Sequence, residues 1–302
     1  MSNEIPAGTI VVGFDGSTHS ERALAWSIEQ AGLENRTLTL LHAVDPGQYL
    51  TMHLEGLAPT PISVTLHDAA EEMLRGAATF VKEQDPTLEV VTVVRMVDPR
   101  TALVDASEAA EMIVVGSRGR GPVARLVLGS VSTALSGSAG CPVVVIGPRT
   151  DDEDQRRGVL VGVDGTESAP SAVEHAYQLA SLRGLPLTVM HVFADPTWVE
   201  GPRDIPYDTP GYEEQRLLLD QAVSGMREKY PDVETTNMFS RGLTDDALIR
   251  VSRSMDLVVV GPHRRRPFIG RLLETNVAKS LTHRAPSIVI VLPKPDDEDA
   301  DG

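Results

Sequence analysis

The segment Met112-Ile-Val-Val-Gly-Ser-Arg-Gly119 joins a run of apolar residues to a turn that contains two glycines. A short apolar run bounded by glycine is typical of a buried β-strand. Because glycine has no Cβ, the backbone at Gly116 and Gly119 can turn tightly and bring its N–H groups close to an anion. We therefore expect a strand at 112–116 that ends at a ligand site.

A helix start follows this turn. Nine residues beyond Gly119, the pair Gly129-Ser130 opens the segment 131–139, which is predicted to be helical. The amino end of a helix carries the positive end of the helix dipole and unpaired N–H groups, so it favours phosphate. Together, the turn and the helix start predict a site for a nucleotide polyphosphate.

The chain contains this pattern twice. Asp15, at the end of Val11-Val-Gly-Phe-Asp15, and His42 each have a counterpart 149 residues later, and the run 112–116 has one 145 residues later. The counterparts are Asp164, His191 and 257–261. Matches in one order at nearly constant spacing indicate a duplicated unit.

Each half alternates short apolar runs with helical patterns. In the first half we expect strands at 9–14, 37–44, 89–97, 112–116 and 143–147, and helices at 18–33, 66–84, 99–110 and 130–139. This alternation predicts an α/β fold of two tandem, doubly wound, Rossmann-like domains, each with a five-stranded parallel sheet. Ligands of such sheets lie at the carboxyl ends of the strands, where the strand order reverses. Placing Asp15 beside Gly116 at that edge requires the order 3-2-1-4-5.

The composition limits both the organisation and the partners. We expect domains at 1–148 and 158–294, a polar linker at 149–157 and an acidic tail at 295–302. A formal net charge of −16 argues against binding to nucleic acid or to a membrane surface. The first residues show neither the basic nor the apolar stretch typical of a signal sequence, so none is expected, and no apolar run approaches the ~20 residues of a membrane span. A cytoplasmic protein is expected.

These residues resemble the universal stress protein family, in particular its tandem-domain bacterial members. The motif Gly116-x2-Gly119-x9-Gly129-Ser130 is that of the ATP-binding type, and Val-Gly-Phe-Asp15-Gly-Ser and Leu-His42-Ala43-Val match as well. The resemblance covers nearly the whole chain. It implies that the first domain binds ATP, either alone or with Mg²⁺, and that the protein has a regulatory or stress-response role.

The resemblance also implies roles for single residues. Asp15 would approach the ribose and adenine, and the backbone of Ala43 would meet the adenine edge. The glycine motif would enclose the ribose and phosphates, while Arg118 and Arg120 either neutralise phosphate or lie in a solvated loop. The candidate nucleotide-binding residues are Gly13, Asp15, Ala43, Gly116, Ser117, Arg118, Gly119, Arg120, Gly121, Gly129, Ser130 and Val131.

The second half departs from this motif. Arg264 stands where the second glycine should be, and Glu274-Thr275 or Thr275-Asn276 replaces the later Gly-Ser. Arginine would crowd the turn and glutamate would repel phosphate, although the run 264–266 could still attract an anion. We expect a degenerate or altered site, and its remaining candidates are Asp164, Val192 and Gly261.

Several other features are assigned structural roles. Gly119-x-Gly121-x-x-Ala124 resembles a dinucleotide fingerprint, but it follows a fourth strand and lacks the acidic residue ~20 positions later. His42 and His191 are expected to make structural hydrogen bonds. Cys141, the one cysteine of the chain, is expected to be a buried small apolar residue, and it leaves no partner for a disulfide.

The sequence indicates neither a catalytic residue nor a metal site. We therefore expect a binding protein whose nucleotide stabilises one conformation. Two alternatives stay open: a slow ATPase, and a scaffold that binds protein partners without nucleotide. The resemblance also implies that the last strands, 142–146 and 287–291, pair within the chain, and that the whole chain forms a dimer.

Overall fold

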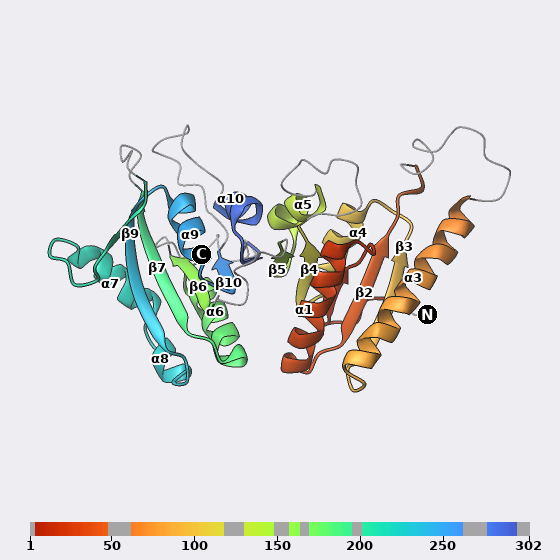
Figure 1. The fold of residues 1–302 in the computed structure, drawn as a ribbon, viewed down its shortest axis with the longest axis horizontal. Coiled ribbons are helices and arrows are strands. Elements are labelled where there is room, and N and C mark those ends of the chain that lie inside the picture. Colours follow the sequence, from red (N-terminus) through yellow and green to blue (C-terminus); the bar gives the residue numbers. More distant parts are fainter. Residues whose placement is uncertain are drawn as a thin grey trace, which may run out of the picture. The chain divides into compact units, whose positions relative to one another are not determined.

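The structure is a computed structural model that describes residues 4–47, 62–117, 130–147, 157–163, 169–194, 201–261 and 277–294. The chain divides into two compact units, Met1–Ile146 and Gly147–Gly302 (Figure 1). Within the described ranges, none of the helices is both long enough and apolar enough to cross a membrane.

The first unit contains a parallel sheet of five strands in the order β3-β2-β1-β4-β5, which confirms the predicted order. The strands are β1 (Ile10–Gly13), β2 (Leu38–Ala43), β3 (Val90–Arg95), β4 (Met112–Gly116) and β5 (Val143–Ile146). The helices are α1 (Thr18–Glu34), α3 (Ile62–Gln84), α4 (Pro99–Ala106) and α5 (Ser130–Ser138). Helix α4 ends at Ala106, four residues before the predicted position, and the hydroxyl of its C-cap residue, Ser107, donates to the carbonyl of Val104 at 2.6 Å.

Helices cover both faces of this sheet. Helix α1 packs on β1 and β4, and α3 packs on β2 and β3 (Figure 1). Because successive strand residues point to opposite faces, the alternate positions Val11, Ile113 and Val115 join a second core with α4 and α5. Strands buried on both faces are nearly continuous apolar runs, which is why these segments were recognisable in the sequence.

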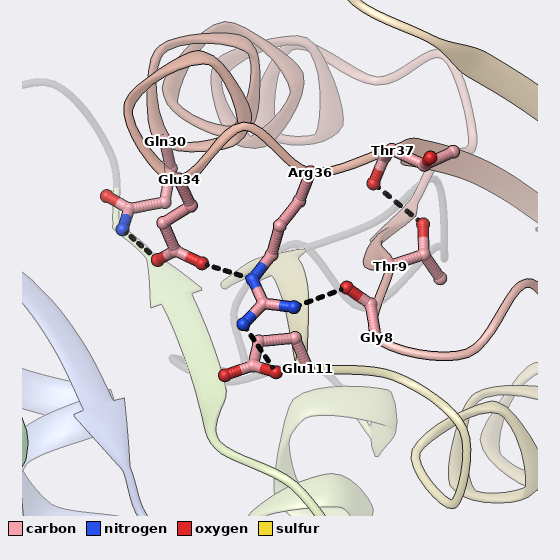
Figure 2. Close-up of polar contacts among 7 residues, drawn as sticks. All are labelled: Gly8, Thr9, Gln30, Glu34, Arg36, Thr37 and Glu111. Carbon is pink, nitrogen blue, oxygen red and sulfur yellow. Dashed lines mark hydrogen bonds and ion pairs between the residues drawn. The ribbon is translucent and has the colours of Figure 1, made fainter.

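At the amino edge of this sheet, a polar network centred on Arg36 connects the segments that lead into the strands (Figure 2). Its guanidinium donates to the carbonyl of Gly8 at 2.9 Å and pairs at 2.9 Å with both Glu34 and Glu111. The buried side chain of Gln30 donates to the same Glu34 carboxylate. The network thus connects the segments that enter β1, β2 and β4, at the edge opposite the predicted ligand site.

The second unit repeats this topology and adds an edge strand. Its parallel strands follow the order β9-β7-β6-β10-β11, and a short strand, β8 (Arg203–Ile205), pairs antiparallel with β9. The parallel strands are β6 (Val159–Val163), β7 (Leu187–Ala194), β9 (Thr235–Gly242), β10 (Leu257–Val260) and β11 (Ile288–Val291). The helices are α6 (Ala169–Arg183), α7 (Glu213–Ala222), α8 (Met226–Lys229), α9 (Thr244–Ser252) and α10 (Val277–Arg284).

The two units share a packing detail that supports their origin by duplication. A Cβ added to Gly13 would lie 3.2 Å from a methyl group of Leu103, and one added to Gly162 would lie 3.2 Å from a methyl group of Leu248. In each unit, a leucine from the helix after the third parallel strand therefore lies against a glycine of the first strand. Neither position has room for a larger side chain.

Candidate functional site

The carboxyl ends of β1 and β4 form the centre of the candidate site. The two strands are hydrogen-bonded neighbours in parallel register, with Val12 opposite Val114. Asp15 lies three residues beyond Val12 and Gly116 lies two residues beyond Val114, so both are at the same edge of the sheet. The structure thus brings together the two residues whose adjacency the predicted strand order required.

Asp15 organises the turn into α1. Its Oδ1 accepts hydrogen bonds from the backbone N–H of Ser17 at 3.0 Å and from the Ser17 hydroxyl at 2.6 Å. Ser17 is the N-cap residue of α1, and its Oγ accepts from the backbone N–H of Ser20 at 3.3 Å. The half-buried Asp15 carboxylate therefore orients the cap, the structural role that the sequence also allowed.

Gly116 lies directly beneath the first turn of α1. A Cβ at this position would be 2.7 Å from the His19 Cβ and 2.8 Å from the His19 carbonyl carbon. Because one of these neighbours is helix backbone, which cannot move aside as a side chain can, only glycine fits here. The absence of a side chain thus lets the amino end of α1 approach the end of β4.

Ser117 continues the chain beyond β4 with a buried hydroxyl. Its backbone N–H donates to the carbonyl of Ile146 at 2.9 Å, so the residue is held in the sheet. The side chain is 3% exposed, and its Oγ has no hydrogen-bond partner in the described part of the chain. A buried hydroxyl without a partner is costly, and such groups in folded proteins call for an explanation.

The end of β2 reaches beyond β1 toward the same site. Nδ1 of His42 lies 2.7 Å from the carbonyl oxygen of Phe14, and Nδ1 of His191 lies 2.7 Å from that of Val163. Both histidines thus make the structural hydrogen bond expected from the sequence. Ala43 is half-buried at the end of β2, opposite Arg95 of β3.

The remaining candidates differ in burial, and several of them lie outside the described residues. Val131 and Val192 pack against the apolar cores of their units, while Ser130 is exposed at the start of α5 and Gly261 is half-buried after β10. Gly13 contacts Leu103, as described above. The other candidates lie outside the described residues, and these are Arg118, Gly119, Arg120, Gly121, Gly129 and Asp164, together with Arg264, Glu274 and Thr275 of the altered second motif.

The amino end of α1 makes this edge favourable for an anion. The first turn of α1 directs the positive end of a 17-residue helix dipole toward the ends of β1 and β4. In the parts of the chain that the structure describes, no cluster of three or more His, Cys, Asp or Glu side chains could hold a metal ion. The arrangement is suited to binding negatively charged oxygen atoms through backbone N–H groups.

Two residues beside the site, His19 and Ser20, were not predicted from the sequence. His19 covers Gly116, and the Ser20 hydroxyl accepts from the backbone N–H of Asp15 at 3.3 Å. The position of Ser20, three residues after the N-cap, was a usable signal, because side chains at that spacing commonly close the first turn. The contact between His19 and Gly116 had no local signal.

Cys141 contributes no chemistry to the site. The thiol is 5% exposed and belongs to the apolar cluster beneath α4 and α5. Burial raises the pKa of the Cys141 thiol to about 12, and only the thiolate is an effective nucleophile. The sequence-based assignment of a buried small apolar residue is confirmed.

Comparisons with known proteins agree with this architecture. The sequence model of the universal stress protein family matches residues 7–147 and again residues 155–293. A universal stress protein of Mycolicibacterium smegmatis is 33% identical over 299 residues, covering 94% of this chain and 97% of the relative. Universal stress protein Rv2005c of Mycobacterium tuberculosis is 35% identical over 291 residues, covering 93% and 96%.

A solved structure shows the same fold across both units. The universal stress protein from Archaeoglobus fulgidus DSM 4304 superposes with a TM-score of 0.68 at 18% identity, and the match covers 97% of this chain and 98% of that one. Such low identity supports the fold alone. The family matches, in contrast, span nearly the whole sequence in two successive segments. The chain therefore belongs to the universal stress protein family and carries two consecutive copies of the family unit.

Proposed function

We propose that this protein binds ATP at the carboxyl edge of its first unit and that the nucleotide serves as a regulatory ligand. One observation carries the proposal: Asp15, two residues beyond β1, and Gly116, the last residue of the adjacent β4, lie at the amino end of α1. A carboxylate, the glycine end of a strand and the amino end of a helix at one edge suit a nucleotide. Its ribose hydroxyls require an acceptor and its phosphates require N–H donors.

The phosphate contacts would come from the end of β4 and the motif that follows it. Gly116 has no side chain of its own and packs against His19 at the amino end of α1, and the buried Ser117 hydroxyl has an unused donor and unused acceptors within the described residues. The motif continues through Gly119 and Gly129-Ser130. The residues present at this edge therefore fit a polyphosphate, and Arg118 and Arg120 supply positive charge in the same segment.

The nucleoside contacts would come from β1 and β2. The Asp15 carboxylate keeps a fixed orientation because Ser17 donates twice to one of its oxygens. A carboxylate held in this way is a preorganised acceptor for ribose hydroxyls. The backbone of Ala43, at the end of β2, would meet the adenine edge.

The second unit is proposed to be degenerate as a nucleotide site. Arg264 and Glu274 replace two small residues of the motif, and both changes oppose a close approach of phosphate to the backbone. We also propose that the protein acts in the cytoplasm and that the complete chain forms a dimer. No residue is assigned a catalytic role.

The proposal is tested by measuring nucleotide released from the purified protein. The full-length chain would be incubated with excess ATP, with and without Mg²⁺, desalted and denatured, and the released nucleotide quantified by chromatography. The expected result is about one ATP per chain, from a single working unit. About two per chain would contradict the degenerate second unit, and none would contradict ATP binding itself. Release of ADP instead would indicate the slow ATPase.

The variant Ser117→Ala tests the placement of the site. Removing a buried hydroxyl that lacks a partner among the described residues should stabilise the ligand-free protein by about 1 kcal/mol and weaken ATP binding about tenfold. Ser287→Ala is the matched control, because Ser287 is 2% exposed in the second unit and its hydroxyl also lacks a partner among the described residues. This control should be stabilised without losing ATP affinity. Unchanged ATP affinity in Ser117→Ala would place the phosphates elsewhere.

A further inference from the structure

A cleft of about 520 Å³ lies on the first unit between α4, the end of β3 and the amino-terminal segment. Its floor is apolar and is formed by Ile5 together with Ala102 and Ala106, the latter two being 4% and 2% exposed. The amino-terminal segment is fixed along this wall, because the backbone N–H of Gly8 donates to the carbonyl of Ala109 at 2.8 Å. The volume falls within the range of about 300–1,000 Å³ that small-molecule sites occupy.

Arg95 brings a positive charge to one end of this cleft. It is the last residue of β3, two positions after the buried Val93, so its side chain shares the sheet face of Val93. The residue is half-buried, yet its guanidinium makes no hydrogen bond or ion pair with the described part of the chain. Partial burial of an arginine without a partner is unfavourable, and a bound anion would relieve that cost.

Asp105 brings a negative charge to the same cleft. It lies between Ala102 and Ala106 on one face of α4, at spacings of three residues and one residue, and it is exposed. Its carboxylate, too, has no side-chain partner in the described ranges. Two opposite charges therefore line one cleft without pairing with each other. A ligand that carries both charges close together would satisfy them at once.

We propose that this cleft binds a free α-amino acid with an aliphatic side chain. Its carboxylate would receive the planar fork of the Arg95 guanidinium, which matches carboxylate geometry. Its ammonium group would face Asp105, and Glu4 adds a second carboxylate to the cleft lining. Its side chain would lie on the floor formed by Ile5, Ala102 and Ala106, where burial of apolar surface contributes to binding.

This site is distinct from the proposed nucleotide site. None of the residues that line the cleft is a nucleotide candidate, so the inference does not rest on ATP binding. The two sites are nevertheless joined by backbone, because Arg95 lies opposite Ala43 in the register of β3 and β2, and its carbonyl accepts from the N–H of Val44 at 2.9 Å.

The ligand class is tested by calorimetric titration of the full-length protein with L-leucine and two analogues that each lack one charged group. These analogues are 4-methylpentanoate, without the ammonium group, and 3-methylbutylamine, without the carboxylate. We expect leucine to bind at one site per chain and each analogue to bind at least about tenfold more weakly. Equal binding of 4-methylpentanoate would overturn the amino-acid assignment, and no leucine binding at about 10 mM would overturn the site.

The placement is tested by paired variants. Arg95→Gln and Asp105→Asn should each weaken leucine binding about tenfold while leaving the far-ultraviolet circular dichroism spectrum unchanged. Arg75→Gln and Glu108→Gln are the matched controls, because both remove an exposed charge from the same unit without lining the cleft. Loss of leucine binding in the controls as well would show that net charge, not the cleft, is responsible, and would overturn the proposal.

Discussion

The imidazole Nδ1 of His42 donates a hydrogen bond to the carbonyl oxygen of Phe14 across 2.7 Å. A carbonyl oxygen can only accept, so the proton must lie on Nδ1, and this fixes the tautomer of the neutral ring. Phe14 immediately precedes Asp15, so the bond ties the end of β2 to the turn that presents the candidate ligand carboxylate. His191 and Val163 make the equivalent bond in the second unit.

This duplicated bond provides a matched pair of variants. His42→Phe and His191→Phe keep an aromatic ring but remove the donor, and each should lower the free energy of unfolding by about 1–3 kcal/mol. Only His42→Phe should also weaken ATP binding, by about tenfold, because only that bond positions Asp15. Urea denaturation and ATP titration measure the two effects. Equal ATP affinity in both variants would show that the His42 bond supports the fold alone.

Gly116→Ala should destabilise the first unit by about 1–3 kcal/mol, because the new methyl group would meet the backbone of His19 at under 3 Å. Gly76→Ala is the control: a Cβ there meets nothing within 4 Å, in the interior of α3. It should stabilise the protein by about 0.5–1 kcal/mol. Thermal or urea unfolding measures the stability of both variants. Equal stability of Gly116→Ala and Gly76→Ala would contradict the close contact between Gly116 and His19. Loss of ATP binding in Gly116→Ala therefore cannot by itself be read as loss of a ligand contact.

The sheet could be predicted from the sequence because its strands are buried on both faces. An uninterrupted apolar run such as 112–116 is recognisable without knowing which strands lie beside it. Because the unit is duplicated, a similar run also occurs in the second half of the chain. β8 had no such signal, since Arg203-Asp-Ile205 is three residues long and two of the three are charged. Its position follows from pairing with β9, a contact between segments some 35 residues apart.

The adjacency of two candidate site residues could be predicted from the sequence, but their contacts could not. Asp15 and Gly116 were identified from motif spacing, and their adjacency followed from the inferred strand order. What the sequence could not supply was the reason for Gly116, because His19 lies far away in the chain and reaches it only through the packing of α1 on β4. The unpaired charges of Arg95 and Asp105 were equally hidden, because neither belongs to a motif.

The Arg36 network predicts a stability effect at the edge opposite the site (Figure 2). Arg36→Met should lower the free energy of unfolding by about 1–2 kcal/mol, since it removes one hydrogen bond to backbone and two ion pairs, one of them to the largely buried Glu34. Arg75→Met is the control, because its pair with Glu72 is exposed on both sides and should contribute less than about 0.5 kcal/mol. Equal urea midpoints for the two variants would show that the network adds nothing beyond a surface pair.

His175 predicts how the stability of the second unit depends on pH. Burial in α6 lowers the pKa of its imidazole to about 4, and its buried Nε2 has no hydrogen-bond partner within the described ranges. In the unfolded chain the pKa is about 6.5, so between pH 6.5 and 4 the unfolded state binds a proton that the folded state does not. The free energy of unfolding should therefore fall by about 3 kcal/mol, through His175 alone, as the pH drops through this window.

Urea titrations at successive pH values measure how the free energy of unfolding depends on pH. His175→Leu should remove the contribution of His175 to this dependence, whereas His67→Leu, on the exposed side of α3, should leave that contribution unchanged. An unchanged slope in His175→Leu would show that folding does not lower the pKa of this ring.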